Sequence, residues 1–374
     1  MSTPQSGRRP HGGSIQPADP ARRRLLRGIA AAALTATGAG CGALEGLGGG
    51  AGRASMGPGR SALLLPLSGQ QAGLGELLQS AVTLGGGPGI GIDILDSGDT
   101  PEQAAVAART AIDAGAQMLV GPVFSAQARA VADVAPRNVP VITLSNDESL
   151  AGSGLWVFGV TPTHSARAVL SLAAQRNQRD VAIVVPPGAY GTQSIAATTR
   201  LAQAFGIRLR PPLVRSSAAG LVDALGGSAG LPDAVYLPAA DATLQPFAAV
   251  LAGSGVQLIG STQWSALDLE SDPAFRGAWF AAPDPLRFAP FKEVFEAETA
   301  SEGGIITGLA YDGTELLRVL GQRGQLDRKG LLNDDGFDGV LGPYRFLSDG
   351  LCQRGLAVLE VGAGEFSLIG ATSV

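Results

Sequence analysis

Two stretches at opposite ends of the chain decide the fold: SALLLPLSGQQAGLG, residues 61–75, and GFDGVLGPYRFLSDGLCQRGLAVLEV, residues 336–361. In the first, an apolar strand over residues 63–65 stops at Pro66, and a Ser-Gly turn at Ser68 opens a helix. Open α/β sheets present ligands in this way, at the carboxyl end of a strand where a helix begins. The pattern therefore predicts a ligand position at this end of the strand.

The length and charge of the chain limit its class. Its 374 residues, 45% of them hydrophobic, are enough for two lobes with a core each. The formal net charge is -5, and without the six Arg and one Asp of residues 1–40 it becomes -10, with 21 basic against 31 acidic residues. An acidic body without a basic stripe argues against nucleic acid as a partner.

The N-terminus has the pattern of an export signal. Four arginines, the last of them Arg27, precede an apolar run over residues 28–40, which is shorter than the roughly 20 residues that span a membrane. This run, with small residues before Cys41, predicts a signal peptide over residues 1–41. Residues 21–27, ARRRLLR, resemble a twin-arginine signal, and an ordinary basic segment fits equally well.

Residues 37–41, TGAGC, resemble a lipobox with Cys41 as the lipidated residue, although Gly38 stands where Leu or Val is usual. The alternative is cleavage nearby, which leaves an unmodified soluble protein. Lipidation predicts a location on the periplasmic side of the bacterial envelope, attached to a membrane through the lipid anchor only. The Gly-rich residues 42–60 are then a flexible tether. We expect Cys352, the other cysteine, to be a free structural thiol in a hairpin-like turn.

The body of the chain alternates short apolar runs with helical patterns, which predicts βαβ units and parallel sheets. The strands are apolar almost throughout, so we expect helices on both faces. After Gly277 a crossing rich in helix and strand breakers, residues 279–285, leads to two helical stretches and a β-hairpin of residues 344–347 and 356–361. Strands are expected at 91–95, 117–121, 139–144, 181–185, 208–214, 234–237 and 257–259, and helices at 104–115, 126–134, 165–175, 193–205, 244–251, 288–300 and 309–321.

A series of landmarks resembles the type I periplasmic-binding fold in its leucine-binding branch. The resemblance implies an α/β protein of two lobes, each a mostly parallel sheet with helices on both faces, with three chain crossings. It places lobe one at 61–160 plus 286–338 and lobe two at 161–285 plus 339–374. The landmarks are Pro66–Gly69, Gly121–Ser125, Val139–Ser145, Tyr190-Gly191, Tyr311-Asp312, Gly336–Gly339, Phe346 and Asp349-Gly350.

Two segments resemble a subgroup, the penicillin-binding protein activators. They are residues 145–149, SNDES, and residues 277–283, GAWFAAP. This resemblance implies a non-enzymatic envelope lipoprotein that regulates peptidoglycan synthesis through contact with a peptidoglycan synthase. The sequence departs from well-studied members, which carry a helical-repeat domain before the binding-protein domain. Here the signal leads almost directly into the first strand.

In the amino-acid-binding branch, lobe-one hydroxyl and backbone N–H groups hold the ligand carboxylate, and a lobe-two tyrosine and an acid complete the site. By position, Ser68, Ser125 and Ser145 supply hydroxyls, helix starts after the first two favour an anion, and Tyr190 covers the ligand. Alternatively, Ser68 and Ser125 only cap helices. The predicted ligand-binding set is Ser68, Gly69, Ser125, Ser145, Asn146, Asp147, Tyr190, Asp241 and Trp264.

The expected ammonium partner is missing from this set. Residues 258–264, LIGSTQW, hold no carboxylate where amino-acid binders commonly have one. Asp147 or Asp241 either replaces it or is a solvated loop residue, and Trp264 either lines the cleft or packs in the core. The second hypothesis is a substrate-binding receptor of an ABC importer for amino acids or a related small solute, which closes over a small-molecule ligand.

Catalytic patterns are missing from the sequence. His11 and His164 are its two histidines, and we expect His164 to cap a helix or lie at the surface. The chain has no H-E-x-x-H motif, no Cys/His cluster and no Gly-Lys-Ser/Thr loop. We therefore expect no enzymatic activity, no metal and no cofactor.

Overall fold

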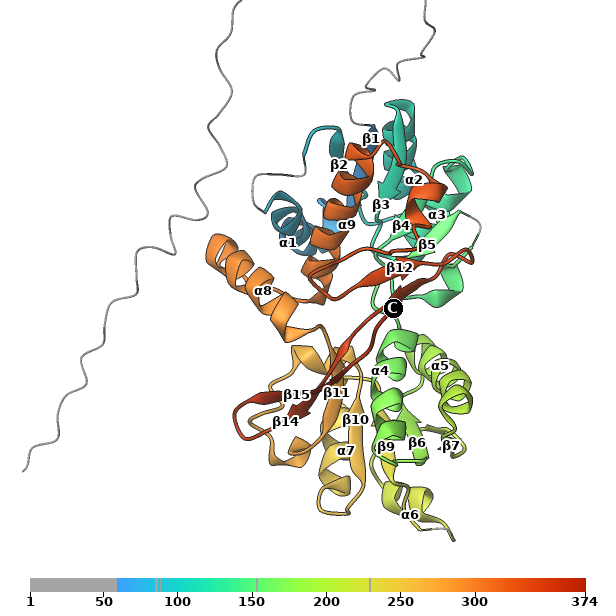
Figure 1. The fold of residues 1–374 in the computed structure, drawn as a ribbon, viewed down its shortest axis with the longest axis vertical. Helices are drawn as coiled ribbons and strands as arrows, with labels where there is room; N and C mark the ends of the chain where they lie inside the picture. Colours follow the sequence, from blue (N-terminus) through green and yellow to red (C-terminus); the bar gives the residue numbers. More distant parts are fainter. Residues whose placement is uncertain (1–58, 85–86, 88, 153, 229) are drawn as a thin grey trace, which may run out of the picture. The chain divides into compact units, whose positions relative to one another are not determined.

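The computed structural model describes residues 59–84, 87, 89–152, 154–228 and 230–374, which belong to one compact unit. The predicted signal peptide, Cys41 and the tether up to residue 58 lie outside the described residues. The body is an α/β protein of two lobes, each built on its own sheet (Figure 1). This confirms the fold class predicted from the alternating strands and helices.

The first sheet is parallel throughout, with the strand order β2-β1-β3-β4-β5. Helices α2 (Pro101–Asp113) and α3 (Ser125–Val134) cover one face, and α1 (Ala72–Thr83) and α9 (Ile305–Gln322) cover the other. Thr100 starts α2 with the expected proline at its first turn, and its side chain accepts the N–H of Gln103. The strands are β1 (Arg60–Leu65), β2 (Ile92–Asp96), β3 (Ala116–Val120), β4 (Val141–Thr143) and β5 (Leu155–Val157).

The second sheet has the order β15-β14-β11-β10-β9-β6-β7, with β8 also paired to β6. Its strands from β6 to β11 run parallel, and β14 and β15 are antiparallel additions at one end. The strands are β6 (Asp180–Val185), β7 (Arg208–Leu209), β8 (Leu213–Val214), β9 (Ala234–Leu237), β10 (Gln257–Gly260), β11 (Trp279–Ala282), β14 (Ala357–Val361) and β15 (Phe366–Ala371).

Helices cover both faces of this second sheet, as Figure 1 shows. On one face lie α4 (Pro162–Gln175) and α5 (Ala189–Phe205), and on the other α6 (Leu221–Gly226) and α7 (Leu244–Leu251). Helix α8 (Pro285–Thr299) and the short α10 (Arg328–Leu331) flank α9 in the chain. No helix among the described residues is both apolar and long enough to traverse a bilayer.

Three predictions of secondary structure were wrong. The expected strand over residues 208–214 is two short strands, because Pro211 and Pro212 have no N–H for a ladder. Residues 279–282, expected to be a crossing, are the buried strand β11. The hairpin partner of β12 (Tyr344–Phe346) is β13 (Cys352–Arg354), whereas residues 357–361 pair with β11 and β15.

The β12–β13 hairpin packs against the first sheet. The N–H of Val157 in β5 donates to the carbonyl of Gly350 at 2.8 Å. The ring of Phe158 meets that of Tyr344 with centroids 4.9 Å apart. The chain therefore passes between the sheets after β5, after β11 and after β13, so that the hairpin residues lie on lobe one although the sequence assigned 339–374 to lobe two.

Candidate functional site

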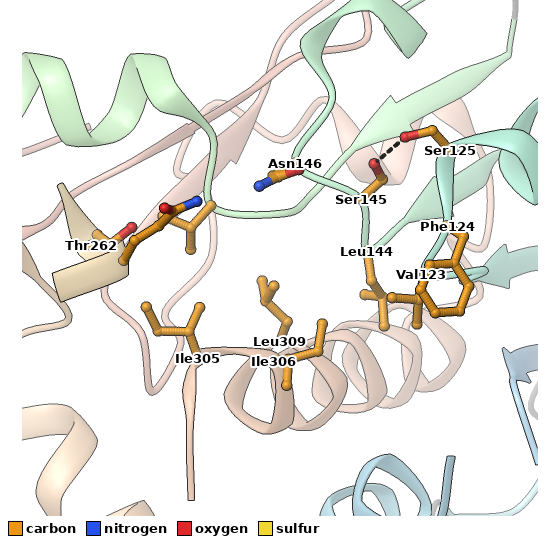
Figure 2. A pocket seen from close by; sticks show the side chains of 12 residues that line it. Val123, Phe124, Ser125, Leu144, Ser145, Asn146, Thr262, Ile305, Ile306 and Leu309 are labelled. Atoms are coloured by element: carbon orange, nitrogen blue, oxygen red, sulfur yellow. Dashed lines mark hydrogen bonds between the residues drawn. The ribbon is translucent and has the colours of Figure 1, made fainter. Parts of the chain in front are cut away.

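A cavity of about 410 Å³ lies in the cleft between the lobes. Polar side chains line it from both lobes: Ser125, Ser145 and Asn146 from the first, and Thr262 and Gln263 from the second. Figure 2 shows Thr262 across the cavity from Ser125 and Ser145, with the isoleucines of α9 along a third side. The apolar lining consists of Val123, Phe124, Leu144, Val160, Ile305, Ile306 and Leu309.

The lobe-one serines meet because they follow neighbouring parallel strands, β3 and β4. The hydroxyl oxygens of Ser125 and Ser145 lie 2.9 Å apart. Phe124 occupies the N-cap position of α3 without a side-chain hydrogen bond, and Ser125 is the first residue of the helix. Ser125 therefore does not cap α3, and it lines the cavity.

The lobe-two polar residues lie on the short 3-10 helix Thr262–Ala266, which follows β10. Ser261 caps this helix by accepting the N–H of Gln263 at 3.1 Å and donates to the carbonyl of Pro238. Gln263 accepts the N–H of Ala240 through its side-chain oxygen, which leaves its amide NH₂ as a donor toward the cavity. The sequence prediction looked for a carboxylate in this stretch and so missed the two residues that line the cavity.

An aliphatic wall comes from the first turns of α9, through Ile305, Ile306 and Leu309. The sequence prediction began this helix at residue 309 and therefore missed the first two. The signal was present, since Gly304 directly precedes two isoleucines and glycine is accepted at helix starts.

Asp147 and Glu148 connect the two lobes at one rim of the cleft, beginning one residue beyond Asn146. The Asp147 carboxylate accepts the side-chain amide of Gln193 on α5 at 2.9 Å and faces Arg129 at 3.3 Å. Glu148 accepts the backbone N–H of Thr163 in α4 at 3.1 Å and lies 3.7 Å from Arg200 of α5. We call these contacts the tied rim.

Asp147 is held as an anion in the tied rim. Burial raises its pKa, but hydrogen bonds from Ser149 and the charge of Arg129 outweigh burial, so that the pKa lies below its usual value. With its oxygens engaged, Asp147 is outside the cavity lining. The twelve lining residues include no charged side chain.

Several residues of the predicted set lie elsewhere. Ser68 is exposed after β1, and its N–H donates to Asp96, whose pKa is lowered by this and other hydrogen bonds against the raising effect of burial. Gly69 follows it with φ +81° in a turn packed against Asp99. Asp241 is exposed and accepts the N–H and hydroxyl of Thr243 ahead of α7.

The two aromatic members of the set point into lobe two. The hydroxyl of Tyr190 donates to Ser261 at 3.3 Å, and burial raises its pKa. Trp264 is fully buried, packs edge-on against Phe275, and donates to the carbonyl of Leu237. The structure therefore places Trp264 in the core, the alternative that the sequence left open.

A buried polar cluster lies where α4 meets the hairpin. His164 is buried, so a surface role was wrong, and its Nδ1 accepts the N–H of Thr161 at the start of α4 while Nε2 lies 2.6 Å from the carbonyl of Cys352. Cys352 lies in strand β13, not in a turn, and burial raises the pKa of its thiol to about 12. No group of three potential metal ligands occurs in the part of the chain that the structure describes.

The fold and the cleft define a two-lobed binding protein. The chain belongs to the periplasmic binding protein family, whose model matches residues 60–365. A comparison with curated proteins gives no match.

Solved structures of similar fold include receptors and a regulator. A putative branched-chain amino acid ABC transporter from Rhodospirillum rubrum is 20% identical, with 83% of this chain and 99% of that chain covered and a TM-score of 0.69. A Rhodopseudomonas palustris BisB5 solute binding protein in complex with 3,4-dihydroxy benzoic acid is 19% identical, with 84% and 96% covered and a TM-score of 0.61. The C-domain of LpoA from Haemophilus influenzae, a regulator of PBP1A, is 17% identical, with 83% and 100% covered and a TM-score of 0.68.

Proposed function

We propose that this protein is a non-enzymatic regulator of peptidoglycan synthesis that acts through contact with a peptidoglycan synthase. The observation that carries the proposal is the tied rim, in which Asp147 and Glu148 bond directly to α4 and α5 of the other lobe. The lobes thereby have a defined relative position that depends on side chains of the chain itself. A surface that spans both lobes then keeps one shape, as a binding partner requires.

The tied rim distinguishes this role from that of a receptor that hinges freely. A ligand shifts a hinge equilibrium only by its differential affinity for the closed state. Where the chain's own side chains already bond across the cleft, ligand binding adds less to closure. Residues 145–149, which carry the resemblance to the activators, are the residues that supply these bonds.

The similarity to the LpoA C-domain supports the class of partner, since that domain is described as a regulator of PBP1A. We extend the proposal to location: an envelope lipoprotein exported by the signal at residues 1–41 and anchored through Cys41. These residues lie outside the described structure, so mass spectrometry of the N-terminal peptide is the direct test. A diacylglycerol-modified Cys41 supports the anchor, and an unmodified N-terminus contradicts it.

The experiment for the regulatory role is a reconstituted peptidoglycan synthesis assay. The full chain is added to each class A penicillin-binding protein of the source organism, and glycosyltransfer and transpeptidation rates are measured. We expect at least one rate to rise severalfold, with co-purification of that synthase. The Asp147→Ala/Glu148→Ala variant, if folded, should lose most of the stimulation. Unchanged rates with every synthase, and no co-purification, contradict the proposal.

A second candidate is favoured by the cavity, which receives polar side chains from both lobes. Such a cavity is the common form of a small-molecule site. The corresponding role is the substrate-binding receptor of an ABC importer for a small organic solute. A thermal-shift screen of the full chain tests it, because a ligand that binds the native state raises the melting temperature by mass action. No saturable shift with amino acids, small organic acids or peptides contradicts this second role.

A further inference from the structure

The first sheet ends differently at its two outer strands, β5 and β2. At β5 the N–H of Val157 donates to the carbonyl of Gly350, so the loop of the β12–β13 hairpin contacts that edge. At β2 no further strand among the described residues pairs with the outer edge. The apolar residues of β1 are fully buried, whereas those of β2 are half-buried. Strand β2 therefore has an edge to which another strand can add.

A groove of about 480 Å³ lies between β2 and α2. It shares no lining residue with the cavity between the lobes. Leu95 and Asp96 line it from β2, and Glu102, Val106 and Thr110 line it from α2. The three α2 residues are spaced four apart and so lie on one side of the helix. Val106 is 57% exposed although its side chain is apolar, so this side of α2 has an apolar surface open to a partner.

Both faces of β2 are apolar at this edge. Leu95 packs with the residues of α2 and α3 on one face of the sheet, and Ile92 and Ile94 pack with those of α1 and α9 on the other. The side chains of an added strand point alternately to these two faces. A segment of β-branched residues, which pack well on a pleated surface, matches this environment.

The groove is acidic at one end. Asp96 is the last residue of β2, and Glu102 lies in the first turn of α2. Burial raises the pKa of Asp96, but hydrogen bonds from Ser68 and from neighbouring backbone N–H groups outweigh burial, so that the pKa lies below its usual value and the carboxylate stays charged. The lining contains no basic side chain. A segment with a basic residue at this end therefore complements the groove.

The same charges argue against a second copy of this chain as the occupant. Pairing β2 with β2 of another copy would bring two sets of Asp93, Asp96 and Glu102 together at one edge. Like charges that face each other across a sheet are destabilising. Without residues 1–40 the formal net charge of each copy is -10, which adds to the repulsion. A basic partner has the opposite preference.

We propose that the groove between β2 and α2 binds an extended, basic segment of a partner protein, which adds to the first sheet as a further strand. A segment of five or six residues matches the five residues of β2, which span about 17 Å. Its backbone pairs with the outer edge of β2, and its apolar side chains contact Leu95, Val106 and Ala107. Its basic residue faces Asp96 and Glu102. The groove lies outside the cleft between the lobes, so this inference goes beyond both proposed roles.

Fluorescence anisotropy with the full chain and a labelled peptide tests the proposal. The probe is acetyl-Lys-Thr-Val-Thr-Val-Thr-Lys-amide, whose two lysines allow either strand direction. The comparison peptide has glutamate in place of both lysines. We expect the dissociation constant of the lysine probe to be at least tenfold lower. Equal dissociation constants, or no binding of the lysine probe to folded protein, overturn the proposal.

Methylation of the peptide backbone tests whether the probe binds as a strand. In a strand, alternate residues direct their N–H groups to the same neighbouring strand. One modified probe carries N-methyl groups on its valines, and the other carries them on its threonines. One of the two should bind like the unmodified probe, and the other should lose at least tenfold in affinity. An equal loss for both contradicts pairing with β2.

Two variants locate the probe in the groove. Val106→Lys should weaken the lysine probe at least tenfold, because it fills the groove and adds a like charge. Glu102→Gln should weaken it severalfold. The matched controls are Val250→Lys on α7 and Glu298→Gln on α8, which change exposed residues outside the groove and should leave the affinity unchanged. Equal effects of the groove and control variants overturn the placement.

Analytical ultracentrifugation of the full chain tests the other occupant. We expect no dimer that depends on the groove. A dimer that dissociates in the Val106→Lys variant would replace the partner strand with a second copy of this chain. The synthase assay does not enter any of these measurements, so the proposed function and this inference are tested separately.

Discussion

The two rims of the cleft use charged side chains differently. At the tied rim the side chains of Asp147 and Glu148 are each 18% exposed and bond to the opposite lobe. At the other rim, which we call the open rim, Lys292 and Glu302 are 38% and 84% exposed and pair only with groups of their own lobe. The tied rim follows Asn146, which lines the cavity of about 410 Å³, and the open rim lines a neighbouring cavity of about 330 Å³. Of these two rims, only the tied rim connects the lobes.

The difference in burial explains why the two rims should contribute differently to the free energy that positions the lobes. Charge pairs in partly buried sites are weakly screened, and hydrogen bonds to charged groups there contribute more than neutral ones. Exposed pairs contribute little because solvent and salt screen them. The tied rim should therefore carry most of the free energy that positions the lobes, and the open rim should remain available to a ligand.

The largest expected effect is the pH dependence of His164, which lies next to Thr163 at the α4 end of the tied rim. Burial lowers the pKa of His164 to about 4, against about 6.5 in the unfolded chain. The native state thus favours the neutral imidazole, whose Nδ1 accepts the N–H of Thr161. The stabilisation that the neutral imidazole gives to the folded state is fully present above pH 6.5 and is lost as pH falls to 4. The free energy of unfolding should change by about 3 kcal/mol over this range.

The titration of Asp312 changes the free energy of unfolding in the opposite direction. The contribution of His164 must therefore be measured as a difference between two variants. Burial raises the pKa of Asp312 to about 6, although Arg354 and two backbone N–H groups lower it, so protonation stabilises the fold as pH falls below 6. We therefore compare urea unfolding of the wild type and His164→Asn between pH 7 and pH 4. The advantage of the wild type should shrink by about 3 kcal/mol over this range. A difference that stays constant with pH contradicts the assignment.

The next effect compares one glutamate from each rim. Glu148→Ala removes the acceptor for Thr163 N–H and the partner of Arg200, and should lower the free energy of unfolding by about 2 kcal/mol. Glu302→Ala at the open rim should change it by less than about 0.5 kcal/mol. Urea unfolding of both variants gives the comparison. Equal values for the two would show that burial does not distinguish the rims.

Much of the fold could be predicted because local patterns agree with it. Thr100 before Pro101 marks the start of α2, and apolar runs mark the strands of both sheets. Strand β11 was missed because its neighbours are breakers, although its own residues 279–282 are buried. The hairpin partner of β12 was also missed. Its pairing depends on tertiary contacts of residues 352–354 with lobe one, and neither the hydrophobic periodicity nor the strand propensity of the segment indicates those contacts.

The site was predictable where it depends on strand ends. Ser125 and Ser145 follow parallel strands, so topology alone brings them together. Thr262 and Gln263 could not be found in this way, because their position depends on a 3-10 helix capped by Ser261. Asp147 was predicted to bind the ligand; in the structure its carboxylate contacts Arg129 of its own lobe and Gln193 of the other, and the second contact depends on how the lobes meet.

A smaller effect is expected for the hydrogen bond that joins the two lobes at the tied rim. The side chains of Asp147 and Gln193 make one hydrogen bond across the lobes, 2.9 Å long. A double-mutant cycle with Asp147→Ala and Gln193→Ala should give a coupling free energy of about 1 kcal/mol. Because Asp147 also bonds to Ser149 and Arg129 on its own lobe, the single variant should cost more than this coupling. A coupling free energy within error of zero would show that this hydrogen bond does not stabilise the contact between the lobes.

The smallest effect belongs to the pair at the open rim. The side-chain nitrogen of Lys292 lies 3.2 Å from Glu302 and 3.5 Å from Glu296. Since Glu302 is 84% exposed, a double-mutant cycle with Lys292→Ala and Glu302→Ala should give less than about 0.5 kcal/mol, vanishing in 1 M salt. The Asp147–Gln193 coupling should keep most of its value in the same salt. A Lys292–Glu302 coupling that equals the tied one and resists salt would show that the difference in exposure does not set the strength of the contacts at the two rims.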